Sequence, residues 1–334
     1  MPFLFPLLAI LIWAANTVVS KAAAGVLDPA AISFYRWVIA ALALSPFCLP
    51  QLWRRRRDLR PWLGKLLVLS LLGMVLYQCL AYYAAHSTSA TNMGVIGSLI
   101  PLLTLLQSAL FFGQRPGKQA LLGMSLSLFG VLWLLGQGNP LALLHSGINP
   151  GDGMMLLGAA SYALYGLLIR RWQLPFGPWL NLYLQILLAV LLLIPVALSA
   201  DSLAIPAQGW SMVLFAGLAS SIFAAYCWMR GLATLGAERT SVFMNLMPLC
   251  TALIAVITLG EPIHGYHLLG GGLILTGLFY TELHSLSWLA VALGSAAFAT
   301  GVIITIMTIM ITALWFAPPL VILRDTPPLD AMKM

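Results

Sequence analysis

The stretch SLIPLLTLLQSALFFGQRPGK, residues 98–118, recurs in altered form as NLMPLCTALIAVITLGEPIHG, residues 245–265. At the offset of 147 residues that relates them, prolines and glycines coincide: Pro101 with Pro248, Gly113 with Gly260, Gly123 with Gly270 and Gly130 with Gly277. Both residue types constrain the backbone locally, so their shared positions indicate duplication more strongly than shared leucines do. A weaker match, at an offset of 149, pairs WAANTVVSK (13–21) with YALYGLLIR (162–170). The sequence therefore predicts two related halves.

The composition indicates a membrane protein. The chain is 61% hydrophobic and 7% charged, with a mean hydropathy of +0.97, whereas a soluble domain carries about 25% charged residues. The first residues, MPFLFPLLAILIWAAN, lack a basic segment and are expected to form a retained first span. The four cysteines show no CxxC spacing and are expected to be core residues, so neither a metal site nor a disulfide is predicted.

A membrane-spanning helix needs about 20 apolar residues. Division at the charged, proline and glycine clusters predicts ten transmembrane helices, at about 3–25, 31–49, 63–85, 89–112, 118–136, 152–171, 177–199, 208–230, 238–260 and 264–283. The predicted fold is thus an all-α integral membrane protein with five helices in each half, at 1–136 and 150–283. The hydrophobic tail 285–334 has no counterpart in the first half. It is expected to form an extra C-terminal helix, with a fused or frameshifted end as the alternative.

Lysine and arginine are distributed unevenly among the predicted loops. The loops after spans two, four, six and eight hold or adjoin these cations: Arg54, Arg55, Arg56, Arg57, Arg60, Lys65, Arg115, Lys118, Arg170, Arg171, Arg230 and Arg239. The loops after the odd-numbered spans hold none. Because cationic loops stay cytoplasmic, the N-terminus is expected on the cytoplasmic side. The Arg54–Arg57 run is then a topology anchor, and no nucleic-acid partner is expected.

An odd number of spans in each half places the second half upside down relative to the first. Inverted repeats of this kind are typical of secondary transporters, which bind substrate near the membrane midplane between the repeats. The duplication therefore predicts a small-molecule transporter embedded in a lipid bilayer.

Three motifs stand in this chain: WAANTVVSK at 13–21, FYRW at 34–37, and the proline and Gly-[Gln/Glu] that close spans four and nine. With these motifs the chain resembles, over about 1–283, the drug/metabolite transporter superfamily, specifically its EamA-type ten-span permeases. The resemblance implies a bacterial inner-membrane exporter of amino acids, other metabolites or drugs that works by alternating access without ATP. Glutamate often follows the glycine in both copies of this family, but here Gln114 stands in the first and Glu261 in the second.

Polar residues inside spans usually face the bundle interior, so they are candidates for the substrate path. The candidate substrate-binding residues are Trp13, Asn16, Arg36, Tyr77, Gln78, Tyr82, Ser98, Tyr162, Tyr165, Tyr226, Trp228 and Asn245. Pro101 and Pro248 are expected to bend the helices of spans four and nine and to act in gating. Ser98 and Asn245 precede these prolines by three residues. The alternative for the serine and proline positions is a role in helix packing only.

The aromatic candidates have a second interpretation, the aromatic belt at the membrane surface. That interpretation fits Trp37, Trp62, Trp172 and Trp179 well, and it fits Tyr77, Tyr165 and Tyr226 less well because they lie some turns inside a span. Of the two cations placed within spans, Lys21 is expected to snorkel or to pair with Asp28. Arg36 lies deeper, so it is the better candidate for binding a substrate carboxylate.

The carboxylates lie at loops or span ends, and no Asp or Glu is expected at mid-span. This favours facilitated export without ion coupling, with a proton-coupled drug exporter as the alternative. A membrane enzyme is not favoured, because the sequence lacks GxSxG, HExxH and P-loop motifs. No cofactor is expected. A non-transporting sensor or assembly subunit is the remaining alternative. The glycine faces of spans five and ten would serve either core packing or a homodimer.

Overall fold

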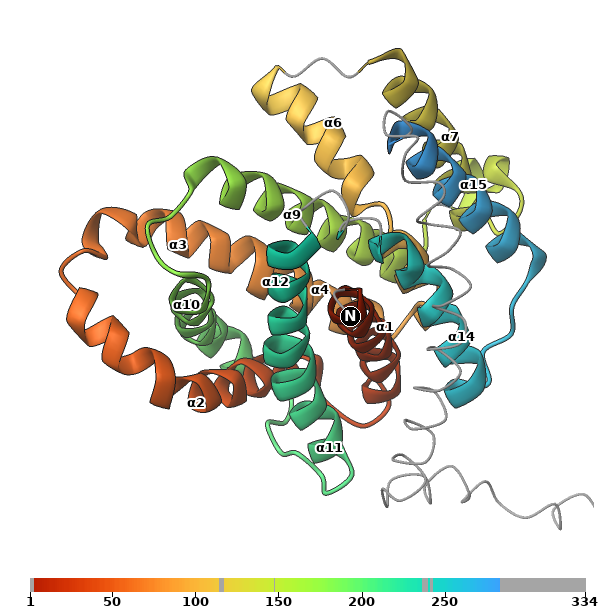
Figure 1. The fold of residues 1–334 in the computed structure, drawn as a ribbon. Coiled ribbons are helices and arrows are strands. Elements are labelled where there is room, and N and C mark those ends of the chain that lie inside the picture. Colours follow the sequence, from red (N-terminus) through yellow and green to blue (C-terminus); the bar gives the residue numbers. More distant parts are fainter. Residues whose placement is uncertain (1–2, 114–116, 147, 236–239, 241–242, 283–334) are drawn as a thin grey trace, which may run out of the picture. The chain divides into compact units, whose positions relative to one another are not determined.

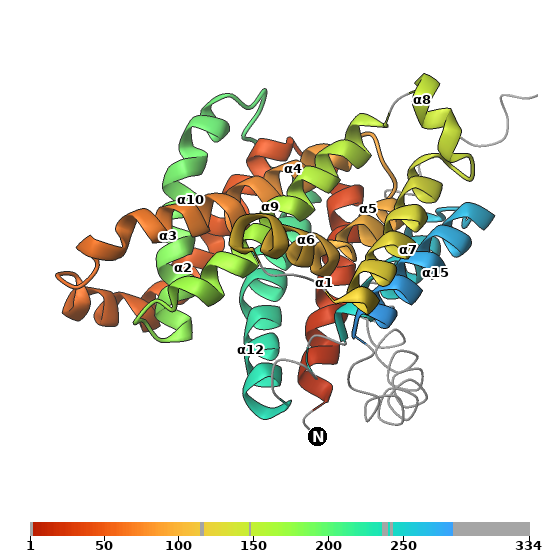
Figure 2. The ribbon, with the colours of Figure 1, turned by 90° about the horizontal axis from the view of Figure 1, so that it is seen from above.

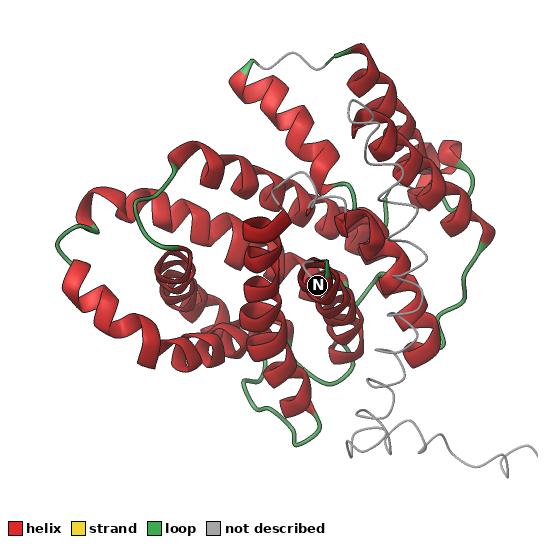
Figure 3. Cartoon of the chain, in the orientation of Figure 1, coloured by secondary structure: helices red, strands yellow, loops and turns green. Residues whose placement is uncertain are grey.

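The computed structural model describes residues 3–113, 117–146, 148–235, 240 and 243–282. Within these residues all regular structure is helical (Figure 3), which confirms the all-α prediction. The predicted extra helix in 285–334 lies outside the described residues.

The first half contains α1 (Leu4–Ala23), α2 (Pro29–Arg55), α3 (Leu63–Leu69), α4 (Tyr77–Ala84), α5 (Ala90–Gly97), α6 (Ile100–Phe112) and α7 (Lys118–Leu135). The second half contains α9 (Pro150–Trp172), α10 (Pro178–Leu198), α11 (Gly209–Leu214), α12 (Ala224–Leu235), α14 (Met247–Leu259) and α15 (Gly265–Glu282). Short pieces complete the described helices: η1 (Arg60–Trp62), η3 (Pro140–Ala142), α8 (Leu143–Ser146) and η5 (Phe243–Leu246). Figures 1 and 2 show their arrangement.

Helix starts follow from local chemistry. Asp28 caps α2 by accepting a 2.7 Å hydrogen bond from the Ala30 N–H, and Pro29 follows as the first helical residue. Asn149 caps α9 in the same way, before Pro150. Proline fits the first turn of a helix because no intrahelical partner exists there for an N–H.

Seven helical segments of the described chain are long and apolar enough to cross a membrane: Leu4–Ala23, Pro29–Arg55, Arg60–Ala84, Ala90–Phe112, Pro150–Trp172, Pro178–Leu198 and Gly209–Leu235. Two further apolar helices, Leu121–Leu135 and Met247–Leu259, are shorter. The multi-span membrane fold is therefore confirmed, while the count of ten spans stays a prediction.

Two spans change their helical winding in the middle. Between α3 and α4 the chain forms a π-helix, η2 (Ser70–Leu76), and between α11 and α12 it forms a second one, η4 (Phe215–Phe223). In η4 the Ser221 hydroxyl donates to the Ala216 carbonyl, five residues back. Such segments are rare and occur often at functional sites, because they redirect side chains and leave carbonyl groups available.

The span at 90–112 is interrupted. Helix α5 ends at Gly97, and α6 starts at Ile100 with Pro101 as its second residue. Pro248 is likewise the second residue of α14. Both helices end on a left-handed glycine, Gly113 and Gly260, each with φ of 65°. A positive φ is disfavoured for residues with a Cβ, which explains glycine at both positions.

Helices α7 and α15 run side by side (Figures 1 and 2) in a close backbone contact. A Cβ built on Gly130 would lie 2.8 Å from the Gly270 carbonyl oxygen, and one on Gly277 would overlap the Gly123 carbonyl oxygen. Only small residues allow this approach. Gly123 and Gly130 of α7 therefore pack against Gly270 and Gly277 of α15 within the chain.

Helices α2 and α10 also pack together, and η2 and η4 adjoin them. Their shared core includes Ala40, Leu44, Ile186, Ala189 and Leu193. This packing places the start of α2 against η4, which positions the site described below.

Candidate functional site

The site is centred on Arg36, which is 2% exposed. Its Nε donates to the Ser221 hydroxyl (3.0 Å), and its Nη2 donates to the Ser220 hydroxyl (3.2 Å). Its Nη1 donates to Gln78 Oε1 (2.6 Å) and to the Tyr82 hydroxyl (3.1 Å). The guanidinium thus joins α2 to α4 and to the π-helix η4.

All four acceptors of the Arg36 guanidinium are neutral, and no carboxylate from the described residues bonds to it. The guanidinium group of arginine carries a positive charge in proteins. The neutral oxygens orient the group without cancelling its charge. Arg36 therefore presents a fixed positive charge inside the protein.

Trp37 lies against this charge. The Arg36 guanidinium carbon is 4.9 Å from the centre of the Trp37 ring, and the Trp37 indole N–H donates to the Met74 carbonyl in η2 (3.2 Å). Trp37 is 4% exposed. The expectation that Trp37 belongs to an interfacial belt is therefore wrong, because its ring is buried between Arg36 and a π-helix carbonyl.

Trp13 approaches the same region from α1. The Trp13 indole N–H donates to the Ser220 carbonyl (3.2 Å), and the Trp13 ring lies 5.4 Å from that of Trp228. Asn16 is one turn further along α1 and 8% exposed, and its Oδ1 has no hydrogen-bond partner. A buried acceptor without a partner is costly unless a ligand or water supplies a donor.

Three tyrosines form a second group next to Arg36. Tyr77, which precedes the Arg36 partner Gln78, packs against Tyr162 with ring centroids 4.8 Å apart. Tyr162 packs against Tyr165 at 5.3 Å. Gly73 of η2 makes room for Tyr165, since a Cβ on Gly73 would lie 2.7 Å from its ring. The aromatic group therefore extends from α4 along α9.

Other predicted site residues lie elsewhere. Tyr226 packs against Phe5 and Trp179, with ring centroids 6.4 Å and 5.9 Å apart. The Ser98 hydroxyl donates to the Val95 carbonyl (2.6 Å) at the end of α5. Asn245 lies in η5, and its side chain is outside the described atoms. Their roles in substrate binding stay predictions.

Lys21 neither pairs with Asp28 nor joins Arg36. Its ammonium donates to the Ala85 carbonyl at the end of α4 (2.7 Å). A cation at a helix C-terminus stabilises the free carbonyls there. Lys21 therefore has a structural partner that the sequence did not indicate.

A polar chain connects α9, α5 and α15 at the end of the bundle that is expected to face outward. Asp152 accepts from the Thr88 hydroxyl and from Asn92 Nδ2 (3.2 Å), and Asn92 Oδ1 bonds to His267 Nε2 (3.1 Å). The His264 N–H donates to His267 Nδ1 (3.1 Å), so the His267 proton resides on Nε2. Asp152 is 4% exposed. The sequence analysis placed this carboxylate at a span end and did not predict that it is buried among hydrogen-bond partners.

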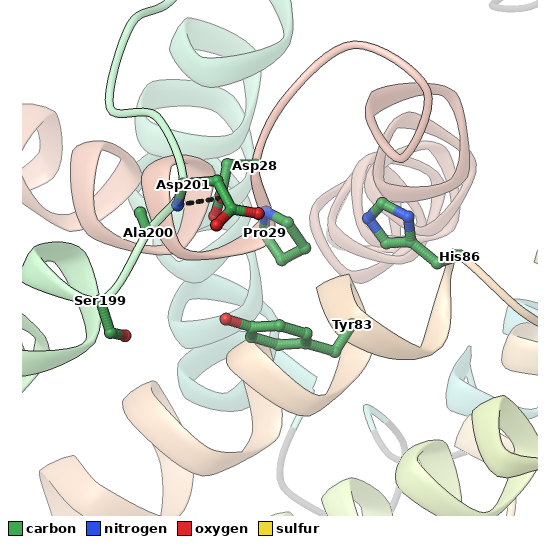
Figure 4. A pocket seen from close by; sticks show the side chains of 7 residues that line it. All are labelled: Asp28, Pro29, Tyr83, His86, Ser199, Ala200 and Asp201. Carbon is green, nitrogen blue, oxygen red and sulfur yellow. Dashed lines mark hydrogen bonds between the residues drawn. The ribbon is translucent and has the colours of Figure 1, made fainter.

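A pocket of about 310 Å³ opens near the same end of the bundle (Figure 4). It is lined by Asp28, Pro29, Tyr83, His86, Ser199, Ala200 and Asp201. The Asp201 N–H donates to Asp28 Oδ2 (3.1 Å). None of the predicted substrate-binding residues lines this pocket, although Tyr83 directly follows Tyr82.

The sequence profile of the EamA-like transporter family matches this chain twice, at residues 1–136 and 149–283. The chain belongs to the EamA-like transporter family. It is therefore a multi-pass membrane protein with a general transport role.

Three relatives show how far the likeness reaches. An uncharacterized transporter of Bacillus subtilis, YyaM, is 27% identical over 78% of this chain and 86% of its own length. The aromatic amino acid exporter YddG of Salmonella typhimurium is 35% identical, over 28% of this chain and 31% of its own length. A protein of known crystal structure, 20% identical, matches with a TM-score of 0.58 over 84% of this chain and 96% of its own. This last likeness concerns the fold alone.

Proposed function

We propose that this transporter exports amino acids or related small metabolites by alternating access, and that Arg36 binds the substrate carboxylate. The observation that carries the proposal is the buried Arg36 charge, which is held by four neutral groups and by no acidic one among the described residues. The proposed location is a bacterial inner membrane, with the N-terminus on the cytoplasmic side.

An unpaired buried charge is unfavourable, because several kcal/mol of hydration are lost for each ion. A substrate carboxylate would restore the missing counter-charge, and a guanidinium matches its planar geometry. Because the Arg36 charge is already buried in the substrate-free protein, the new ion pair would add directly to the free energy of binding. The same reasoning disfavours cationic substrates at Arg36.

The surroundings of Arg36 fit an amino acid with an apolar or aromatic side chain. Asn16 offers an unpaired oxygen, which would accept from an ammonium group. Aromatic surface near Arg36 comes from Trp13, Trp37, Tyr77 and Tyr82. The partial likeness to an aromatic amino acid exporter supports the same substrate class.

Alternating access requires two halves that exchange roles. The two matches to one family profile support such halves. The paired prolines, paired left-handed glycines and two π-helical spans support them also. We propose that the halves are inverted five-helix repeats at 1–136 and 150–283, with the Arg36 group between them.

Counterflow of labelled phenylalanine in proteoliposomes tests this function. We expect saturable flux without an ion gradient, reduced at least tenfold in Arg36→Gln and partly retained in Arg36→Lys, which keeps the charge but loses the fork. Arg56→Gln is the matched control, since Arg56 is exposed and packs on Trp53. Equal flux in Arg36→Gln and in the unaltered protein would refute the role of Arg36. Absence of flux for every amino acid tested would favour the sensor alternative.

Proton-coupled export is the second candidate function. The Asp152–Asn92–His267 chain favours it, because it links two titratable side chains across three helices. Flux that requires a pH gradient, and loses this requirement in Asp152→Asn, would favour coupled over facilitated export.

A further inference from the structure

A second buried polar residue occupies the position in the second half that Arg36 occupies in the first. At the offset of 149, Pro29 pairs with Pro178 and Arg36 pairs with Gln185. Both prolines are the first residues of their helices, so Arg36 and Gln185 are each the eighth residue, in α2 and α10. Arg36 is 2% exposed and Gln185 is 1% exposed. Most glutamines lie at protein surfaces.

Each of the two residues adjoins the π-helix of the opposite half. The Arg36 side chain bonds to Ser220 and Ser221 of η4, and the Gln185 main-chain carbonyl accepts a 2.8 Å hydrogen bond from the Ser70 hydroxyl of η2. Helix α10 packs on η2 as α2 packs on η4. Both helices therefore pack on the π-helix of the opposite half at the position of this residue.

The Gln185 amide is only half satisfied. Its Nε2 donates to Asn181 Oδ1 (3.0 Å), whereas its Oε1 has no hydrogen-bond partner. The Tyr165 side chain lies close enough to interact with the amide, but no hydrogen bond of ordinary geometry reaches Oε1. A fully buried acceptor in this state can accept a hydrogen bond from a ligand that reaches it.

The tyrosine group connects the two residues. Tyr165 lies beside Gln185, Tyr162 packs on Tyr165, and Tyr77 packs on Tyr162 next to the Arg36 partner Gln78. With a rise of about 1.5 Å per residue, Arg36 and Gln185 each lie about 10 Å from the start of their helix. If those starts face opposite sides of the membrane, as the loop charges predict, Gln185 lies on the cytoplasmic half of the path.

We propose that Gln185 forms a second substrate site, which accepts a hydrogen bond from the ammonium group of an amino acid entering from the cytoplasm. The substrate then moves along the tyrosines until its carboxylate reaches Arg36. The two halves thus supply unlike groups at equivalent positions: an acceptor for the ammonium and a cation for the carboxylate. This proposal rests on the proposed amino-acid export.

Isothermal titration of the detergent-solubilised protein tests the site with three ligands: phenylalanine, phenethylamine, which lacks the carboxylate, and 3-phenylpropanoate, which lacks the amine. We expect Gln185→Leu to raise Kd for phenylalanine and phenethylamine about tenfold or more, and to leave 3-phenylpropanoate within about twofold, because one charge-assisted hydrogen bond is lost. Arg36→Gln should weaken phenylalanine and 3-phenylpropanoate instead.

Two further variants make the result decisive. Gln107→Leu is the matched control, since Gln107 also has an unpaired Oε1 but lies on α6, and it should change no Kd. Gln185→Glu keeps the side-chain size and should tighten phenethylamine binding, which an unfolded protein would not do. Equal changes for all three ligands in Gln185→Leu, or none, would overturn the second site while leaving amino-acid counterflow intact. Failure of the unaltered protein to bind any of the three would overturn both proposals.

Discussion

The Ser127 hydroxyl donates a 3.1 Å hydrogen bond to the carbonyl oxygen of Ile274, the residue 147 positions further along the chain. This separation equals the offset between the two related halves. A residue that contacts its own counterpart lies close to the axis that relates the two copies. The contact between α7 and α15 supports the proposed inverted repeats, and so do the reciprocal approaches of Gly130 and Gly277.

The α7–α15 contact predicts a strong effect of one methyl group. Gly277→Ala should lower the stability by about 1–3 kcal/mol, because the added Cβ meets the Gly123 carbonyl and the Ser127 hydroxyl. Gly272→Ala is the control on the same helix, where a Cβ meets nothing within 4 Å. The measurement is thermal unfolding in detergent. Equal Tm values for the two variants would contradict the close packing.

The contact between α2 and η4 predicts an effect on substrate affinity. A Cβ on Gly217 would lie 2.9 Å from the Arg36 carbonyl oxygen and 3.0 Å from Ile39 Cγ2. Gly217→Ala should therefore push α2 away from η4 and disturb the bonds from Arg36 to Ser220 and Ser221. We expect a severalfold higher KM for phenylalanine counterflow.

Gly166→Ala on α9 provides the comparison, since a Cβ there meets nothing within 4 Å. Its KM should match that of the unaltered protein. An unchanged KM in Gly217→Ala would mean that the position of α2 against η4 does not govern binding.

Glu261 is expected to fasten α5 to the loop after α14. Its carboxylate accepts from the N–H groups of Ala90 (2.8 Å) and Thr91 (3.1 Å) and from the Thr91 hydroxyl (2.9 Å). Glu261→Ala should lower stability by about 1–2 kcal/mol, because it leaves the first amides of α5 without an acceptor and removes an anion from a helix N-terminus. Hydrogen exchange at Ala90 and Thr91 should accelerate.

Glu261→Gln should show a smaller change, because the amide oxygen still accepts one bond. Exchange rates that are equal in the alanine variant and the unaltered protein would refute the capping role. Glu261 stands at the Gly-[Gln/Glu] motif of the family, so we expect that motif position to act structurally in this protein.

The residues that define the fold could be found from the sequence because they repeat. Pro101 and Pro248 lie in the first turn of corresponding helices, and Gly113 and Gly260 follow their last residues in the same left-handed conformation. Arg36 was identified because a cation well inside an apolar helix is unusual. These signals are local, so one sequence suffices to detect them.

The partners of these residues could not be predicted. Arg36 bonds to Ser220 and Ser221 across more than 180 positions, and no local pattern encodes that pairing.

The π-helix at SLLGMVL is an ordinary apolar sequence, so its altered winding depends on its neighbours, including Tyr165 against Gly73. Trp37 was misassigned because tryptophan is common at membrane surfaces, while its burial depends on packing. Gln185 was missed although its offset from Arg36 could have revealed it.

The loop charges predict the orientation of the chain, which single cysteines can report. Asp201→Cys places a thiol at the pocket lined also by Asp28 and His86, and Arg57→Cys places one in the cationic loop. Both positions are exposed. A membrane-impermeant maleimide applied to intact cells should label Asp201→Cys and should label Arg57→Cys only after the membrane is opened. The unaltered protein measures the background from its own cysteines, three of which are buried. Labelling of Arg57→Cys in intact cells, with Asp201→Cys protected, would reverse the orientation and place Gln185 on the outer half of the path.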